Sequence, residues 1–258
     1  IIEMKESVCS RGKGVPFNSP ETVMVAGATG GIGKALTEAV AKQYPDATLI
    51  RLARDPARLV ELNNPTIDLQ FDLLDESSIS EAIDQITPGR IDLAFVASGF
   101  LHDHNYKPEK TFKSLNSDHL LYAYQTNAIG PALLCKHLIP RMNDQQVSRI
   151  GILSARVGSI SDNRLGGWHA YRSSKAALNM LIRNFAIELG YKRRQLIIVG
   201  LQPGTTDTQL SAPFQANVPD GQLQTTQYTA EQLLKVMTFL KMEDSGKLFD
   251  FLGLPFEP

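Results

Sequence analysis

The chain has 258 residues, with 26 lysines and arginines against 27 aspartates and glutamates, and only two cysteines. A chain of this length buries a full hydrophobic core without disulfides or structural metals. Its net charge of −1 gives no global field that would attract nucleic acid or an anionic membrane, and no apolar run reaches the roughly 18 residues of a membrane span. The composition therefore favours a protein that acts on small molecules, with neither a nucleic-acid nor a membrane partner.

The cysteines and the first residues indicate a cytoplasmic location. Cys9 and Cys135 lie far apart and match no metal-ligand spacing, so we expect reduced thiols, with a disulfide as the less favoured alternative. Residues 1–13 contain no apolar segment like that of a secretory signal, although the chain begins with Ile rather than Met. We therefore expect an unsecreted protein.

Residues 1–20 differ from the rest of the chain. They contain Gly12, Gly14, Pro16 and Pro20 and show no sustained periodicity. This pattern predicts a loosely packed N-terminal extension. No Pro/Gly/Ser linker divides the chain after residue 20, so residues 21–258 are expected to form one domain.

From residue 22 onward, short β-rich segments alternate with helical patterns. Strands are predicted at residues 22–26, 48–52, 66–71, 91–97, 149–154, 195–201 and 247–251, and helices at 31–44, 56–62, 77–86, 118–142, 170–189 and 229–242. The alternation implies right-handed crossovers and an α/β fold, a doubly wound parallel sheet of the Rossmann type with helices on both faces. The irregular stretches 100–116 and 202–227 follow strands and are expected to border the ligand crevice.

A glycine-rich turn joins the first predicted strand to the first predicted helix. Gly27 permits a tight turn, Gly31 lets the backbone approach a pyrophosphate, and Gly33 allows close packing of helix on strand. A generic Gly-rich turn is the alternative, while a P-loop is disfavoured because Ala35 stands where a hydroxyl would bind Mg²⁺. The predicted cofactor contacts in this turn are Gly27, Thr29, Gly30, Gly31, Ile32 and Gly33.

The ends of the next two strands carry charged residues that could read the nucleotide. Arg54 follows the second strand and could pair with the 2′-phosphate of NADP, although the adjacent Asp55 could instead bond the 2′-hydroxyl of NAD. Arg54 therefore favours NADP(H) as the predicted cofactor. The alternative is that Arg54 is only a solvated surface residue. Asp72 and Leu73 follow the third strand and are placed to touch the adenine, unless Asp72 serves only to begin the next helix.

Tyr171 and Lys175 stand four residues apart in a regular predicted helix, which places them on one helical face. A phenol with a pKa of about 10 exchanges protons poorly at neutral pH. A nearby ammonium stabilises the phenolate and lowers that pKa. The pair is a candidate acid–base centre, although the spacing alone is more often structural.

The motifs occur together in a known order. The glycine turn, the segment YQTNAIG that contains Asn127, the pair Tyr171 and Lys175, and the segment PGTTDT at residues 203–208 resemble the short-chain dehydrogenase/reductases over residues 22–253. Residues 154–163 and 168–179 look most like the branch of C-factor-like proteins and sniffer-like carbonyl reductases. The resemblance implies an oxidoreductase that interconverts a carbonyl and an alcohol with NADP(H).

The resemblance also implies roles for individual residues. Tyr171 would exchange a proton with the substrate oxygen, Lys175 would bind the nicotinamide ribose and lower the pKa of Tyr171, and Asn127 would bend its helix and hold a water. Thr206 and Thr208 would hold the carboxamide. Further cofactor contacts implied by the resemblance are Ala97, Ser98, Gly99, Pro203 and Gly204. A homodimer or homotetramer through the two long helices is implied as well, although monomeric carbonyl reductases exist.

Two positions depart from the family pattern. A Ser-Ser pair normally ends the fifth strand, but here Ser154 is followed by Ala155. Ser154 could replace the missing hydroxyl only if the turn is reshaped, since alternate residues of a strand point to opposite sides, and Ser159 is a second candidate. The other departure is at residues 96–99, which read VASG where the family often has Asn-Asn-Ala-Gly.

The departure at Ala155 leaves a second function open. Loss of one oxyanion donor lowers a rate by roughly 100-fold or more, so a nucleotide-binding signalling or scaffold protein with little turnover is the alternative. No metal site is expected, because His102, His104 and His119 lack a carboxylate or cysteine at ligand spacing.

Overall fold

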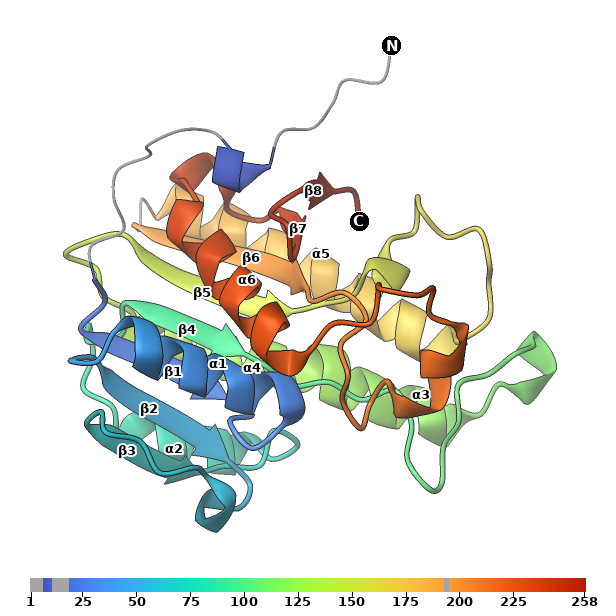
Figure 1. Cartoon of the computed structure of the whole chain (residues 1–258), viewed down its shortest axis with the longest axis horizontal. Helices are drawn as coiled ribbons and strands as arrows, with labels where there is room; N and C mark the ends of the chain where they lie inside the picture. Colours follow the sequence, from blue (N-terminus) through green and yellow to red (C-terminus); the bar gives the residue numbers. More distant parts are fainter. Residues whose placement is uncertain (1–6, 11–18, 193–194) are drawn as a thin grey trace.

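The computed structural model describes residues 7–10, 19–192 and 195–258, and these form an eight-stranded sheet (Figure 1). The spatial order is β3-β2-β1-β4-β5-β6-β7-β8, with parallel pairing throughout except between β7 and β8. The strands are β1 (Thr22–Ala26), β2 (Thr48–Ala53), β3 (Thr66–Gln70), β4 (Leu93–Val96), β5 (Ser148–Leu153), β6 (Leu196–Gln202), β7 (Leu248–Asp250) and β8 (Pro255–Phe256). This confirms the predicted doubly wound α/β fold. The strand order reverses between β1 and β4, which is where such folds bind ligands.

Helices cover both faces of the sheet, as Figure 1 shows. They are α1 (Gly31–Gln43), α2 (Glu76–Asp84), α3 (Ser117–Tyr124), α4 (Gly130–Leu138), α5 (His169–Tyr191) and α6 (Thr226–Phe239). One apolar core joins α1 and α6 to the sheet, and the other joins α2, α4 and α5 to the opposite face. The central strands β5 and β6 are therefore buried almost throughout, whereas the edge strand β3 exposes four of its five residues.

Several predicted boundaries are wrong for local reasons. The single helix expected at residues 118–142 is divided into α3 and α4 by a π-helical turn, Gln125–Ile129, which contains Asn127. The helix expected at 56–62 is only a 3₁₀ turn, Pro56–Arg58, because Leu59 already has extended backbone. Helix α6 begins at Thr226 rather than at residue 229, because the Thr225 side chain accepts a hydrogen bond from Tyr228 N and caps it. The strand β8 was not predicted.

The described part of the N-terminal extension packs against the domain. Val8 is 1% exposed in the core beneath α6, and its N–H donates to Gly253 O at 2.8 Å. Gly253 has φ +77°, and a Cβ there would lie 2.8 Å from Val8 Cγ2, so the close approach requires glycine. The expectation of a loosely packed arm is therefore wrong for residues 7–10. Residues 1–6 and 11–18 lie outside the described residues.

The helices and the possible metal ligands were compared with what a membrane span and a metal site require. Among the described residues, each helix is too short or too polar to cross a membrane. The same residues contain no group of three His, Cys, Asp or Glu side chains that could hold a metal ion.

Cys9 and Cys135 are free thiols, and burial raises the pKa of Cys135 to about 12. Cys135 is therefore an unreactive core residue.

Candidate functional site

The predicted site residues gather at the carboxyl edge of the sheet. Figure 1 shows that the segments following β4, β5 and β6 lie at the same end of the molecule. The turn at Gly27 touches the end of β4, since a Cβ on Gly27 would lie 3.0 Å from Ala97 O. A Cβ on Gly99 would lie 3.7 Å from Lys175 Nζ. Residues far apart in sequence thus lie together at the carboxyl ends of β1, β4 and β5, where ligands of such sheets bind.

The glycine turn forms an open cradle at the start of α1. Gly27 has φ +82°, and a Cβ on Gly33 would clash with Gly27 O. Gly30 and Gly31 are exposed, and no side chain caps the α1 N-terminus within the described residues. A Cβ on Gly31 would lie 2.8 Å from Thr208 Cγ2, so glycine lets the segment after β6 approach the turn closely. Backbone N–H groups at such a helix start fit a pyrophosphate.

Ser98 adds a second observation that fits a nucleotide. Its hydroxyl oxygen is buried and has no hydrogen-bond partner within the described residues. A buried polar atom without a partner is costly, and a ligand hydroxyl or phosphate would satisfy it. The residues present therefore fit a bound dinucleotide.

The structure separates the roles of Arg54 and Asp55. Asp55 accepts a hydrogen bond from Ala57 N and caps the 3₁₀ turn, whereas Arg54 is exposed and forms no ion pair with any described residue. Arg54 and Asp72 line one hollow of about 300 Å³ at the ends of β2 and β3. Arg54 thus remains available for a phosphate.

Asp72 and Leu73 occupy the turn after β3. Asp72 is exposed, and its carboxylate accepts from Leu74 N, while Asp75 rather than Asp72 caps α2. Leu73 is buried against Gly130, where a Cβ would lie 2.6 Å from Leu73 Cγ. The alternative in which Asp72 begins the helix is therefore wrong, and a contact of either residue with adenine stays a prediction.

Asn127 joins the loop after β4 to α5. Its Oδ1 accepts from Phe100 N at 2.7 Å, and its Nδ2 donates to Phe100 O at 2.8 Å and to Ser174 Oγ at 3.0 Å. The side chain is fully buried, and the π-helical turn carries it into this position. The helix irregularity expected at Asn127 is therefore present. It lets the Asn127 side chain bond Ser174, the residue before Lys175.

Tyr171 and Lys175 lie one turn apart near the start of α5. Lys175 Nζ lies 5.9 Å from the centroid of the Tyr171 ring and donates to Leu153 O at 2.9 Å. Burial lowers the pKa of Lys175 to about 8 and raises the pKa of Tyr171 to about 12. Burial is the cause of the Tyr171 shift in the chain by itself, and the lowering of this pKa by Lys175 that the resemblance implies stays a prediction.

Ser154 is bonded to a residue of α5 that lies about two turns beyond Tyr171. Its hydroxyl is buried and donates to Asn179 Oδ1 at 2.6 Å. Asn179 is eight residues beyond Tyr171, which is about 12 Å along the axis of α5. Ser159 is also buried, and its oxygen accepts from Asp162 N at 3.2 Å. The structure therefore gives the Ser154 hydroxyl a packing contact between β5 and α5, in place of the expected substrate contact.

The segment after β6 reaches the glycine turn through Thr208. Thr208 packs against Gly31, whereas the Thr206 hydroxyl is 2.9 Å from Thr229 Oγ1 and buried under α6. Pro203 begins the turn and Gly204 has φ +75°, which favours glycine. Only the backbone of Thr206 is thus left to face a cofactor, since its hydroxyl is already bonded.

Aromatic side chains stand beside Tyr171. The Trp168 ring lies 6.3 Å from the Tyr171 ring and 4.8 Å from the Phe214 ring, and the Phe214 ring lies 5.5 Å from His102. The sequence did not single out Phe214 as a member of the site. Its position in an irregular segment gave no periodic signal.

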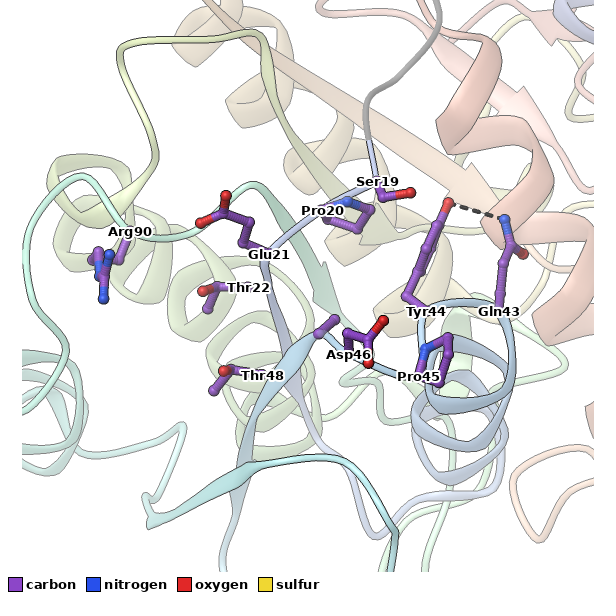
Figure 2. A pocket seen from close by; sticks show the side chains of 11 residues that line it. Ser19, Pro20, Glu21, Thr22, Gln43, Tyr44, Pro45, Asp46, Thr48 and Arg90 are labelled. Carbon is purple, nitrogen blue, oxygen red and sulfur yellow. Dashed lines mark hydrogen bonds between the residues drawn. The ribbon is translucent and has the colours of Figure 1, made fainter.

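A separate hollow of about 460 Å³ lies at the opposite edge of the sheet, where β1 and β2 begin (Figure 2). Tyr44 stands at its wall, with its hydroxyl 2.9 Å from Gln43 Nε2. Burial raises the pKa of Tyr44. Because ligands of parallel α/β sheets bind at the carboxyl ends of the strands, this hollow is not part of the candidate site.

Comparison with known proteins identifies the family. The sequence profile of the family described as short chain dehydrogenase matches residues 21–219. The chain belongs to the short-chain dehydrogenases. It is accordingly an oxidoreductase, as the resemblance of its motifs implied.

Individual relatives agree with this assignment. The chain is 32% identical to the C-signal of Myxococcus xanthus over 130 residues, which is 50% of this chain and 73% of that protein. It is 25% identical to an uncharacterised oxidoreductase of Schizosaccharomyces pombe over 252 residues, covering 90% of this chain and 96% of the relative.

Solved structures share the fold of this short-chain dehydrogenase. NADPH-bound carbonyl reductase from chicken fatty liver superposes with a TM-score of 0.78 at 24% identity, covering 93% of this chain and 99% of the other. The carbonyl reductase Sniffer of Drosophila melanogaster gives a TM-score of 0.77 at 20% identity, covering 93% and 100%.

The buried ammonium of Lys175 predicts a folding stability that rises with pH. Because the folded pKa of about 8 lies below the unfolded value of 10.5, the unfolded chain binds more protons between these values. The unfolding free energy of the wild type relative to Lys175→Met should increase by about 2 kcal/mol between pH 7 and pH 10. Denaturant titrations measure it, with the exposed Lys34→Met as the control for loss of one charge. A pH-independent difference contradicts the prediction.

Proposed function

We propose that this short-chain dehydrogenase is an NADPH-dependent carbonyl reductase. The observation that carries the proposal is the pair Tyr171 and Lys175, held by Asn127 beside an open glycine cradle at the carboxyl edge of the sheet. Acid–base chemistry next to a dinucleotide site is what carbonyl reduction requires.

The chain's own residues supply the proton. NADPH, when bound, supplies a hydride to the carbonyl carbon. With a pKa of about 12, the Tyr171 phenol is protonated at neutral pH and donates its proton to the oxygen of the substrate as negative charge develops there. Lys175, with a pKa of about 8, is largely protonated at neutral pH and stabilises the phenolate that forms.

Residues around the crevice would hold the cofactor. The backbone of the Gly27–Gly33 turn would bind the pyrophosphate, and the Ser98 hydroxyl would form a hydrogen bond with the nucleotide. Thr208 would contact the nicotinamide group. The aromatic rings of Trp168 and Phe214 favour apolar or aromatic carbonyl compounds as substrates.

Replacement of Tyr171 tests the proposed mechanism. Tyr171→Phe removes the proton donor but keeps the ring contacts, so NADPH oxidation with aromatic aldehydes or ketones should fall at least about 100-fold while NADPH binding persists. Absorbance at the NADPH band follows the reaction, and NADPH fluorescence follows binding. Activity that survives the substitution overturns the assignment of Tyr171.

Ala155 decides between a fast and a slow enzyme. Because the Ser154 hydroxyl is bonded to Asn179 and residue 155 is alanine, a nucleotide-binding protein with little turnover is the second candidate function. In the same assay, Ala155→Ser restores the hydroxyl of the family pattern. A large gain in rate supports a wild type with little turnover. An unchanged rate contradicts it and means that another group already takes the place of the missing hydroxyl.

Arg54 is proposed to select NADPH. Loss of a charge-assisted hydrogen bond costs about 1.5–3 kcal/mol, so Arg54→Ala should reduce the ratio of kcat/KM for NADPH over NADH by about 10- to 100-fold. Arg58→Ala is the matched control, since Arg58 is also exposed and lies in the adjacent 3₁₀ turn. An unchanged ratio in Arg54→Ala counts against the proposed contact.

An apolar stripe on α5 supports the proposal of a homo-oligomer. Met180, Ile187 and Tyr191 share one helical face and are 62%, 42% and 84% exposed, and Leu121 and Ile129 are exposed on the α3 and π-helical segments. We infer that these helices pair with a second copy of the chain.

Light scattering tests this pairing. The wild type should have at least twice the mass of one chain, and the double variant Met180→Glu and Ile187→Glu should have the mass of one chain because charges are costly in an apolar interface. A wild type that remains monomeric at high concentration refutes the interface.

The free thiols of Cys9 and Cys135 support the proposal of a cytoplasmic location. Reduced cysteines are typical of that compartment.

A further inference from the structure

The turn that precedes the catalytic helix has an unfavourable backbone conformation. Gly166, Gly167 and Trp168 have φ values of +62°, +64° and +50° in succession, and Trp168 is the one non-glycine residue with positive φ in the described parts of the chain. A bulky residue adopts this conformation only where its surroundings impose it. Tyr171 follows three residues later, so this turn fixes how α5 begins.

Glu109, from the loop after β4, holds this turn. Its backbone carbonyl accepts from Trp168 N at 2.6 Å, and both oxygens of its carboxylate lie 3.3 Å from Ala170 N. Trp168, at the N-cap position of α5, makes no side-chain cap, so the Glu109 carboxylate takes that place from 61 residues away. A negative charge is favourable at the start of a helix.

His119 on α3 is the partner of this carboxylate. Its Nδ1 lies 3.3 Å from Glu109 Oε1, and the two side chains are only 5% and 2% exposed. The imidazole stacks on Tyr106 with ring centroids 4.9 Å apart and packs edge-on to Phe100. Phe100 is the residue whose backbone Asn127 clamps.

The loop after β4 is therefore tied to α5 on both sides of Tyr171. The Glu109 contacts lie before it, at Trp168 and Ala170, and the Asn127 contact lies after it, at Ser174. Each tie is buried, and each would shift the helix relative to the end of β4 if it were lost.

We propose that Glu109 and His119 form a buried latch that imposes the left-handed turn at Trp168 and thereby positions Tyr171 and the Trp168 ring at the site. They are positioning residues, which touch neither substrate nor cofactor. The inference rests on the proposed function for its kinetic consequence but not for its structural one.

The fluorescence of Trp168 reports on the latch directly, because it is the one tryptophan of the chain. Glu109→Ala should shift its emission to longer wavelength and increase its quenching by acrylamide, and Glu109→Gln, which keeps an acceptor for Ala170 N, should recover part of the wild-type signal. Lys110→Ala, at an exposed position of the same loop, is the control and should leave the emission unchanged. Equal spectra for the wild type and Glu109→Ala overturn the latch.

Kinetics give the second readout. In Glu109→Ala, kcat should fall about 10- to 100-fold through misplacement of Tyr171, while the affinity for NADPH stays close to that of the wild type. A parallel loss of kcat and of NADPH affinity would mean that Glu109 supports the structure in general rather than the position of Tyr171, and it overturns the proposal. If the wild type lacks reductase activity, the proposed function fails, whereas the fluorescence comparison still decides the latch.

Two glycines provide a matched pair should Glu109→Ala fail to fold. Gly166 and Gly167 share the left-handed conformation, but a Cβ on Gly166 meets nothing within 4 Å, whereas one on Gly167 lies 3.2 Å from Glu109 O. Gly167→Ala should therefore perturb Trp168 emission more than Gly166→Ala does. Equal effects would show that backbone strain alone, without the Glu109 contact, sets the turn, and would overturn the proposal.

Discussion

The three hydrogen bonds of the Asn127 side chain are the constraint on which the site depends. They join the π-helical turn between α3 and α4, the backbone of Phe100 after β4, and Ser174 beside Lys175. Because the side chain is completely buried, an amide that lost any one of these bonds would leave polar groups unsatisfied in the core. These bonds therefore hold the segment after β4 in place relative to α5.

Burial sets the chemistry that this geometry can perform. Removal from water disfavours the charged form of each member of the proposed acid–base pair, so it lowers the pKa of Lys175 and raises the pKa of Tyr171. The phenol is then a proton donor at neutral pH, which suits the reduction of a carbonyl. The buried ammonium of Lys175 donates a hydrogen bond to Leu153 O. Ionisable groups with such shifted pKa values are typical of functional sites.

The sequence predicted the features that depend on local spacing. The glycine turn and the helical pair Tyr171 and Lys175 are recognisable because their geometry follows from residues a few positions apart. The contact of Ser154 with Asn179 and the docking of Val8 on Gly253 were not predictable, since each joins segments that only the folded chain brings together. The helix break at Asn127 was expected only through family resemblance, and its π-helical form came from the structure.

A crystal structure of the complex with NADPH tests the proposed site. The pyrophosphate should lie on the Gly27–Gly33 turn, the nicotinamide ring should face the Tyr171 hydroxyl, and Arg54 should contact the 2′-phosphate. A dinucleotide bound away from the glycine turn, or with its nicotinamide turned away from Tyr171, would contradict it.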